Sequence, residues 1–361
     1  MSKGGRRAYL GGVLESHVRS IQEIFQMLEE PPPSSLDKVA WSQVTKLGDE
    51  ISKQATVAGM LWSGETPDVK ALEENMGAYC NLLHGFILLC HGSTVGAGPT
   101  LHASICASAK QVIDCSISLL REAVSSCDSR SSNKSLSIPK LSGLVWEACD
   151  ALKKTPTTNC TAIGRAMAQV AVSVKDVLRE LGELKPAASD DDSADGTSGE
   201  AADKPQDSDE EGGLIESDLG DGLTPEEMGI AQLAISVVSD ALTIIKEVIR
   251  FITGLLKSSG HVRSTEDYVD SLERLLGCCQ EMGTQVNELG ASVYPPQEIS
   301  QMKLISKKMH GGVDEMRAEV GSLQGSSGGV YEAFEGLKNS LGKLECMLGD
   351  DLVPEMGRLA V

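Results

Sequence analysis

Cysteine and histidine residues occur twice in a spacing that could bind zinc. Cys80 and His84 are four residues apart, and so are His102 and Cys106. In a helix this spacing puts both members of a pair on one face, and two such faces could close a tetrahedral site. The alternative is that these are polar-tolerant core positions of two neighbouring helices. We favour that alternative and expect no stoichiometric zinc, because the pairs lack the short loop spacing of structural zinc sites.

The spacing of cysteine and histidine residues also disfavours redox and hydrolytic chemistry. Cys278 and Cys279 are adjacent, so on a helix their side chains diverge by about 100°. A redox pair would need the Cys-x-x-Cys spacing and an activating helix start. None of the histidines lies in a local nucleophile–base arrangement. We therefore predict a protein that is not an enzyme, with no catalytic, cofactor-binding or metal-binding residues.

Two serines have the pattern that acidophilic kinases of the casein-kinase type modify. Ser189 and Ser208 are each followed by three acidic residues, and we regard both as possible phosphorylation sites. They lie in the segment 186–223, where thirteen acidic residues and Lys204 give a net charge of −12 out of the chain's −20. Such a segment cannot bury enough apolar surface to offset chain entropy. We predict that it is an acidic, disordered linker.

The elements that must position all of these residues are helices. Apolar residues recur at steps of three and four along most of the chain, and no stretch alternates with a period of two. We expect helices over 8–30, 35–61, 67–91, 99–126, 139–152, 158–184, 224–258, 265–289, 297–323 and 329–347. The fold class is therefore all-α. Short connections favour two antiparallel up-and-down bundles, 1–185 and 224–361, which the linker should leave separable in solution.

The helix expected over 224–258 carries the clearest local signals. Thr224 is a capping residue, Pro225 suits the first helical position and Glu227 completes a capping box. Apolar side chains occupy several faces of this helix, with Ile245 in the middle of the main seam. We therefore expect it to be the spine of the C-terminal bundle rather than an exposed recognition helix.

Composition narrows the class of partner. The net charge of −20 argues against binding nucleic acid or an anionic membrane surface, both of which require clustered Lys and Arg. The most apolar run, 228–239, is shorter than the ~20 residues that span a bilayer. Ten cysteines at largely core-type positions behave as small hydrophobes and indicate a reducing compartment. We expect a soluble, intracellular, protein-binding scaffold.

Four short segments resemble stretches of the cyclin-D-binding protein (GCIP) family. They are, in chain order, Gln54-Ala-Thr-Val-Ala-Gly-Met-Leu-Trp-Ser63, Leu144-Val-Trp-Glu-Ala-Cys149, Val174-Lys-Asp-Val-Leu-Arg-Glu-Leu181 and Ser292-Val-Tyr-Pro-Pro296. The acidic interruption between the two halves also fits this family. The resemblance covers most of the chain.

The resemblance implies an all-helical protein that binds D-type cyclins and helix-loop-helix transcription factors. It also implies negative regulation of cell-cycle progression and a distribution between cytoplasm and nucleus. No helix begins with a run of Lys and Arg, which agrees with a family lacking a DNA-contacting basic region, and no clear leucine zipper is present. The partner-binding residues stay unknown at this stage. The alternative is a structural adaptor of talin- or vinculin-like type, whose helices have a similar composition.

Overall fold

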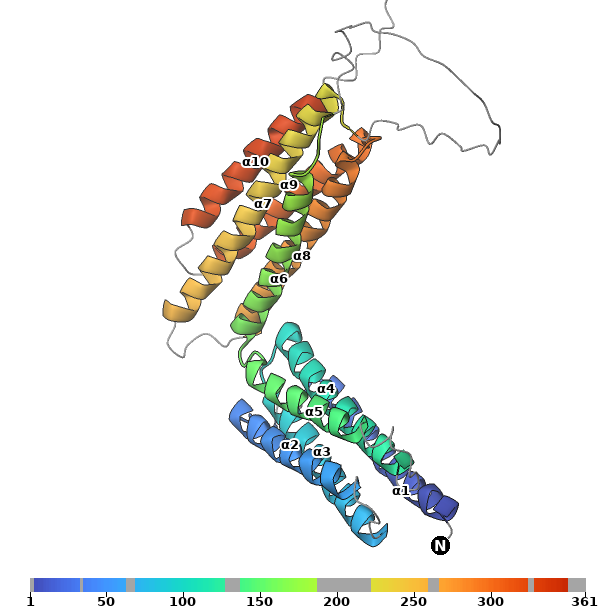
Figure 1. Cartoon of the computed structure of the whole chain (residues 1–361). Helices are drawn as coiled ribbons and strands as arrows, with labels where there is room; N and C mark the ends of the chain where they lie inside the picture. The colour runs from blue at the N-terminus through green and yellow to red at the C-terminus, as the bar shows by residue number, and fades with distance from the viewer. Residues whose placement is uncertain are drawn as a thin grey trace, which may run out of the picture. The chain divides into compact units, whose positions relative to one another are not determined.

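The computed structural model describes residues 3–32, 35–62, 69–126, 137–186, 222–258, 266–323 and 328–349. Within these ranges the regular elements are helices joined by short connections, and no residue belongs to a β-strand (Figure 1). The helices are α1 (Lys3–Glu29), α2 (Trp41–Trp62), α3 (Val69–Ser93), α4 (Pro99–Ser126), α5 (Ser137–Ala151), the 3-10 helix η1 (Leu152–Lys154), α6 (Asn159–Leu181), α7 (Pro225–Ser258), α8 (Glu266–Val293), α9 (Ile299–Ser322) and α10 (Gly328–Gly349). The predicted all-α fold class is confirmed.

The chain divides into two compact units, and the division falls inside helices. The first unit is Met1–Ala166 with Leu256–Arg274, and the second is Met167–Leu255 with Leu275–Val361. The sequence boundaries placed all of 158–184 in the N-terminal bundle, whereas most of α6 belongs to the second unit.

The reason is the close packing of α6 on α8. A Cβ atom at Gly283 would lie 2.7 Å from Val170 Cγ1, and one at Gly290 would lie 2.7 Å from Val177 Cγ1. Two glycines of α8 therefore make room for two valines of α6. Val174, between them, is fully buried.

The first unit is a ring of five helices around one core. In order around the ring they are α1, α3, α2, α5 and α4, so α1 packs between α3 and α4 rather than beside α2. Aliphatic side chains fill the core, and Tyr79 of α3 is its largest fully buried member. The Tyr79 hydroxyl donates to Ser116 Oγ at 3.1 Å, which satisfies its polar atom.

In the second unit α7 buries a broad apolar face. Ile245 is fully buried, as are Val238 two turns earlier and Ile244 and Val248 beside it, whereas Ser236, Ser239, Thr243 and Lys246 lie on an exposed stripe. The predicted capping box is present: Thr224 N–H donates to Glu227 Oε2 at 2.9 Å, and Glu227 N–H donates to Thr224 Oγ1 at 3.2 Å. These contacts confirm the expected start of the helix.

The start of α2 differs from the sequence expectation. Residues 35–40 are not helical, and α2 begins at Trp41. Val39 N–H donates to the carbonyl of Gly92 at 3.0 Å, and a Cβ atom at Gly92 would lie 2.4 Å from Val39 Cγ2. This segment is therefore held in a non-helical conformation against the end of α3. The predicted start of the helix 67–91 and the linker residues 187–221 lie outside the described residues.

Candidate functional site

The structure does not bring the two Cys–His pairs together into one site. Cys80 is fully buried, while His84 faces α1 and His17. Cys106 Sγ lies 3.6 Å from His102 Nδ1 and donates to the carbonyl of Leu28 at 3.4 Å. Among the described residues no cluster of His, Cys, Asp and Glu could hold a metal ion.

The described cysteines carry raised thiol pKa values where a shift is resolved. Burial raises the pKa of Cys80, Cys149 and Cys279 to about 12. The thiolate is the reactive form, so a raised pKa makes these thiols poor nucleophiles. Cys278 diverges from Cys279, as expected: its Sγ is partly exposed and lies 3.9 Å from Glu315 Oε2. Ser189 and Ser208 lie outside the described residues.

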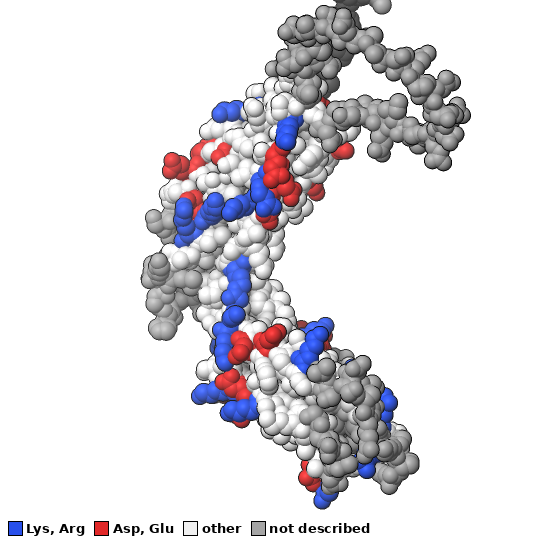
Figure 2. All heavy atoms as spheres, viewed as in Figure 1, with Lys and Arg blue, Asp and Glu red and all other residues white. Residues whose placement is uncertain are grey.

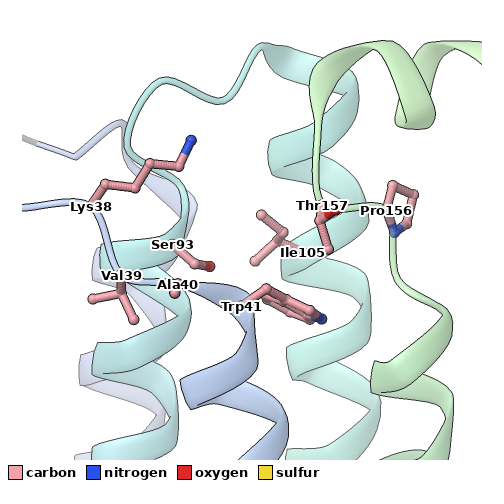
Figure 3. Close-up of a pocket in the computed structure, with 8 residues that line it drawn as sticks. All are labelled: Lys38, Val39, Ala40, Trp41, Ser93, Ile105, Pro156 and Thr157. Atoms are coloured by element: carbon pink, nitrogen blue, oxygen red, sulfur yellow. The ribbon is translucent and has the colours of Figure 1, made fainter. Parts of the chain in front are cut away.

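An apolar pocket of about 400 Å³ opens in the first unit (Figure 3). Its walls come from the segment before α2, the end of α3, the first turns of α4 and the segment before α6. The lining residues are Lys38, Val39, Ala40, Trp41, Ser93, Ile105, Pro156 and Thr157.

Hydrogen bonds fix the pocket walls. Trp41 Nε1 donates to the carbonyl of Leu152 at 2.9 Å, and Ser108 and Thr155 share a hydrogen bond of 2.8 Å. The one charged lining residue is Lys38, which is exposed. The lining suits an apolar side chain better than a reacting substrate, because it offers no acid–base pair.

A second feature lies along the seam between α2 and α5. Small residues of α2 let α5 approach: a Cβ atom at Gly59 would lie 2.8 Å from Ser142 Oγ. Ser142 Oγ donates to the carbonyl of Ala55 at 3.4 Å. Trp146 Nε1 donates to the carbonyl of Ser52 at 3.2 Å and to Thr56 Oγ1 at 3.1 Å. The tryptophan is therefore held against α2 by its polar edge.

Large apolar side chains remain exposed beside this seam. Trp146 is 43% exposed and Met60, one turn after Thr56, is 73% exposed. We call these two residues the α2–α5 surface. A fixed aromatic ring beside an exposed apolar side chain is the kind of anchor that dominates protein–protein interfaces.

Ion pairs border the α2–α5 surface. Lys153 Nζ lies 3.2 Å from Asp49 of α2 and 3.0 Å from Asp150 of α5. The surface thus has an apolar centre with a charged edge, as interfaces commonly do. Its residues come from the segments 54–63 and 144–149, which carried the family resemblance in the sequence.

Neither the pocket nor the α2–α5 surface is predicted as a site from the sequence. One signal was available: Val145, Ala148 and Cys149 form the buried face of α5, which leaves Trp146 off that face. The pocket had no comparable signal, because it depends on the non-helical course of residues 35–40.

Charge is mixed over the described surface. Figure 2 shows Lys and Arg in small groups among Asp and Glu, without one continuous basic face on the side drawn. By length and composition, Pro99–Ser126 and Pro225–Leu255 could each cross a membrane. The central helices of bundles pass the same test, and about half of each apolar window is buried in the structure, 44% and 50% respectively.

The described residues form an all-helical fold with a pocket in the first unit and partly exposed apolar side chains along the α2–α5 seam. Residues 43–187 match the N-terminal model, and residues 188–318 the C-terminal model, of the family described as Grap2 and cyclin-D-interacting. The chain belongs to this family, as the resemblance predicted.

A curated relative supports the same assignment. The chain is 29% identical over 216 residues to the cyclin-D1-binding protein 1 homolog of Xenopus laevis. The match covers 59% of this chain and 58% of the frog protein.

Proposed function

We propose that this chain is a non-catalytic regulator that binds a D-type cyclin. Two observations support this proposal: both family models are described by an interaction with cyclin D, and the frog relative is described as a cyclin-D1-binding homolog. The structural support is the α2–α5 surface. It exposes a fixed tryptophan and lies within the region that the N-terminal family model matches.

The proposed mechanism is sequestration. Trp146 and Met60 would contact an apolar groove or helix of the cyclin, and the charged edge around them would exclude water from these apolar contacts. Covering that part of the cyclin would prevent its use by other partners. The pocket beside Trp41 would accept one further apolar side chain of the same partner.

Several finer features belong to the same proposal. The chain would bind helix-loop-helix transcription factors as well, restrain cell-cycle progression, and occupy both cytoplasm and nucleus. It would act without direct contact to nucleic acid or membrane, since its net charge of −20 gives no broad attraction to either.

Affinity purification tests the class of partner. The chain and its Trp146→Ala variant would be used in parallel as bait, and recovered proteins would be identified by mass spectrometry. We expect a D-type cyclin with the wild-type bait and much less of it with the variant. Recovery of actin or adhesion proteins in place of any cyclin would support the talin- or vinculin-like alternative and contradict the proposal.

A further inference from the structure

The first half of α9 is unusually basic for this chain. Residues 299–313 contain three lysines and no acidic residue. Leu304 is 49% exposed, and Lys303, Lys307 and Lys308 follow the same side of the helix at steps of three to five residues. We call these four residues the α9 lysine face.

Neighbouring acids leave most of this positive charge uncompensated. Lys308 Nζ lies 3.8 Å from Glu288, and Glu345 accepts from Ser306 at 2.7 Å and lies 3.5 Å from His310. Within the part of the chain that the structure describes, Lys303 and Lys307 have no ion-pair partner. An exposed leucine with lysines around it is complementary to an acidic, leucine-containing peptide.

The chain contains such a peptide. The acidic segment includes 208–219, Ser-Asp-Glu-Glu-Gly-Gly-Leu-Ile-Glu-Ser-Asp-Leu. Its acids flank the apolar pair Leu214-Ile215, so one short stretch offers both kinds of contact.

The two described ends of the acidic segment are adjacent. Leu223 N–H donates to the carbonyl of Lys185 at 3.1 Å, and Pro186 pairs with Leu223 in a β-bridge. Both ends therefore enter the second unit at one place, next to the first turn of α7.

The first turn of α9 lies at that same end. Gln297 Nε2 donates to the carbonyl of Glu227 at 2.9 Å, which joins the start of α7 to the residues just before α9. Leu304 follows Ile299 by five residues, about 7.5 Å along the helix axis. Ile215 precedes Gly222 by seven residues, which can reach about 23 Å when extended. The segment between Ile215 and Gly222 is therefore long enough to bring Ile215 to Leu304.

We propose that residues 208–219 bind the α9 lysine face of the same chain. Leu214 and Ile215 contact Leu304, and the flanking acids lie beside Lys303 and Lys307. Attachment at both ends raises the effective concentration of this peptide to about the millimolar range, so that weak contacts suffice. The interaction is intramolecular and does not depend on the identity of the partner protein.

Acylation of lysines in the full-length chain tests the proposal. An amine-reactive reagent would be applied to the wild-type chain and to a variant with Asp209→Asn, Glu210→Gln, Glu211→Gln, Glu216→Gln and Asp218→Asn. Mass spectrometry then gives the modification rate of each lysine. We expect Lys303 and Lys307 to react several-fold faster in the variant. Lys175, exposed on α6, is the internal control and should not change.

High salt and a deletion of the C-terminal residues complete the experiment. Raising the ionic strength of the wild-type chain should raise the rates of Lys303 and Lys307, because salt screens exposed charges. Equal rates in the wild-type chain and the variant would overturn the proposal. The proposal would also be overturned if Lys303 and Lys307 reacted faster only after removal of residues 350–361. That result would mean that the C-terminal tail, and not residues 208–219, covers the α9 lysine face. Isotope-labelled and unlabelled chains can also be mixed and treated with a zero-length reagent that joins carboxylates to lysines. Crosslinks between residues 208–219 and the α9 lysine face that form only between differently labelled chains would show binding to a second copy, and would contradict the intramolecular proposal.

Discussion

The indole N–H of Trp146 donates to the carbonyl of Ser52 at 3.2 Å, while 43% of the tryptophan remains exposed. The hydrogen bond joins α5 to α2 and sets the orientation of the ring before any partner arrives. A side chain already fixed in one orientation loses little entropy on binding. This relationship makes Trp146 the residue through which the proposed function is most readily tested.

Replacing Trp146 should separate binding from stability. We predict that Trp146→Ala lowers affinity for the partner by at least about tenfold, which corresponds to about 1.4 kcal/mol. The free energy of unfolding should fall by only about 1 kcal/mol, because the ring is partly exposed. Titration calorimetry and chemical denaturation measure the two effects.

Leu144→Ala is the matched control for that experiment. Leu144 is 39% exposed on the same helix, two residues from Trp146 and therefore on a different side of α5. It should leave affinity nearly unchanged. An equal loss of affinity in both variants would show that α5 is needed only for folding.

Two glycines test the tight seam between α2 and α5. A Cβ atom at Gly59 would lie 2.8 Å from Ser142 Oγ, whereas one at Gly143 would meet nothing within 4 Å. We predict that Gly59→Ala destabilises the chain by about 1–2 kcal/mol through overpacking. Gly143→Ala should stabilise it by about 0.5–1 kcal/mol through helix propensity. Thermal melts show whether each variant raises or lowers the melting temperature. Stabilisation by Gly59→Ala would mean that α2 and α5 lie farther apart than in the structure.

Ile245 tests whether α7 packs into the core of the second unit or serves as a recognition surface. The side chain is fully buried, so Ile245→Asp places an unpaired charge in the core. We predict a loss of about 3 kcal/mol or more in the free energy of unfolding. Exposed Thr243→Asp, on the same helix, is the control and should cost little. A variant at Ile245 with wild-type stability and no partner binding would instead make α7 a recognition surface.

The division of the chain inside α6 changes what cleavage of the linker should do. The sequence boundaries alone predict two fragments that separate. In the structure α6 packs on α8 through Val170 and Val177, so the N-terminal fragment carries a helix of the second unit. We predict that a chain cut at an engineered protease site within 187–221 still elutes as one complex. Gly290→Leu places a side chain where Val177 packs, so it should let the two fragments separate. Separation of the fragments without this substitution would contradict the packing of α6 on α8.

His84 gives the first unit a pH dependence. Its Nε2 atom is buried without a hydrogen-bond partner among the described residues, and burial, followed by the nearby His17, lowers its pKa from the usual 6.5. The unfolded chain therefore binds this proton more readily than the folded chain. Stability is full above about pH 6.5 and falls as the pH is lowered through and below that value. His84→Gln should show a shallower loss between pH 7 and 5.5 in denaturant titrations, and an unchanged slope would exclude His84 as the cause.

Local signals in the sequence predicted most of the fold. The capping box at Thr224, the bounds of α7 and the burial of Ile245 follow from contacts within a few residues or from helical periodicity. The non-helical segment at Val39 and the division inside α6 could not be predicted in this way. Both depend on partners distant in the chain, Gly92 in one case and Gly283 in the other.

The candidate site shows the same limit. Periodicity distinguishes the buried Val145 from its neighbour Trp146, but it does not say which helix covers the tryptophan. Its hydrogen bonds to Ser52 and Thr56 span about ninety residues of sequence. The sequence disfavours a zinc site because its Cys–His pairs lack the short loop spacing of structural zinc sites. In the structure Cys106 donates to the carbonyl of Leu28 and is not directed toward Cys80.

The most direct test of the proposed function is a calorimetric titration of the purified chain with a purified D-type cyclin. We expect saturable binding at one site per chain, at least about tenfold weaker for Trp146→Ala and unchanged for Leu144→Ala. Absence of any heat of binding at high micromolar concentrations, with a chain whose thermal melt shows it to be folded, would contradict the proposal.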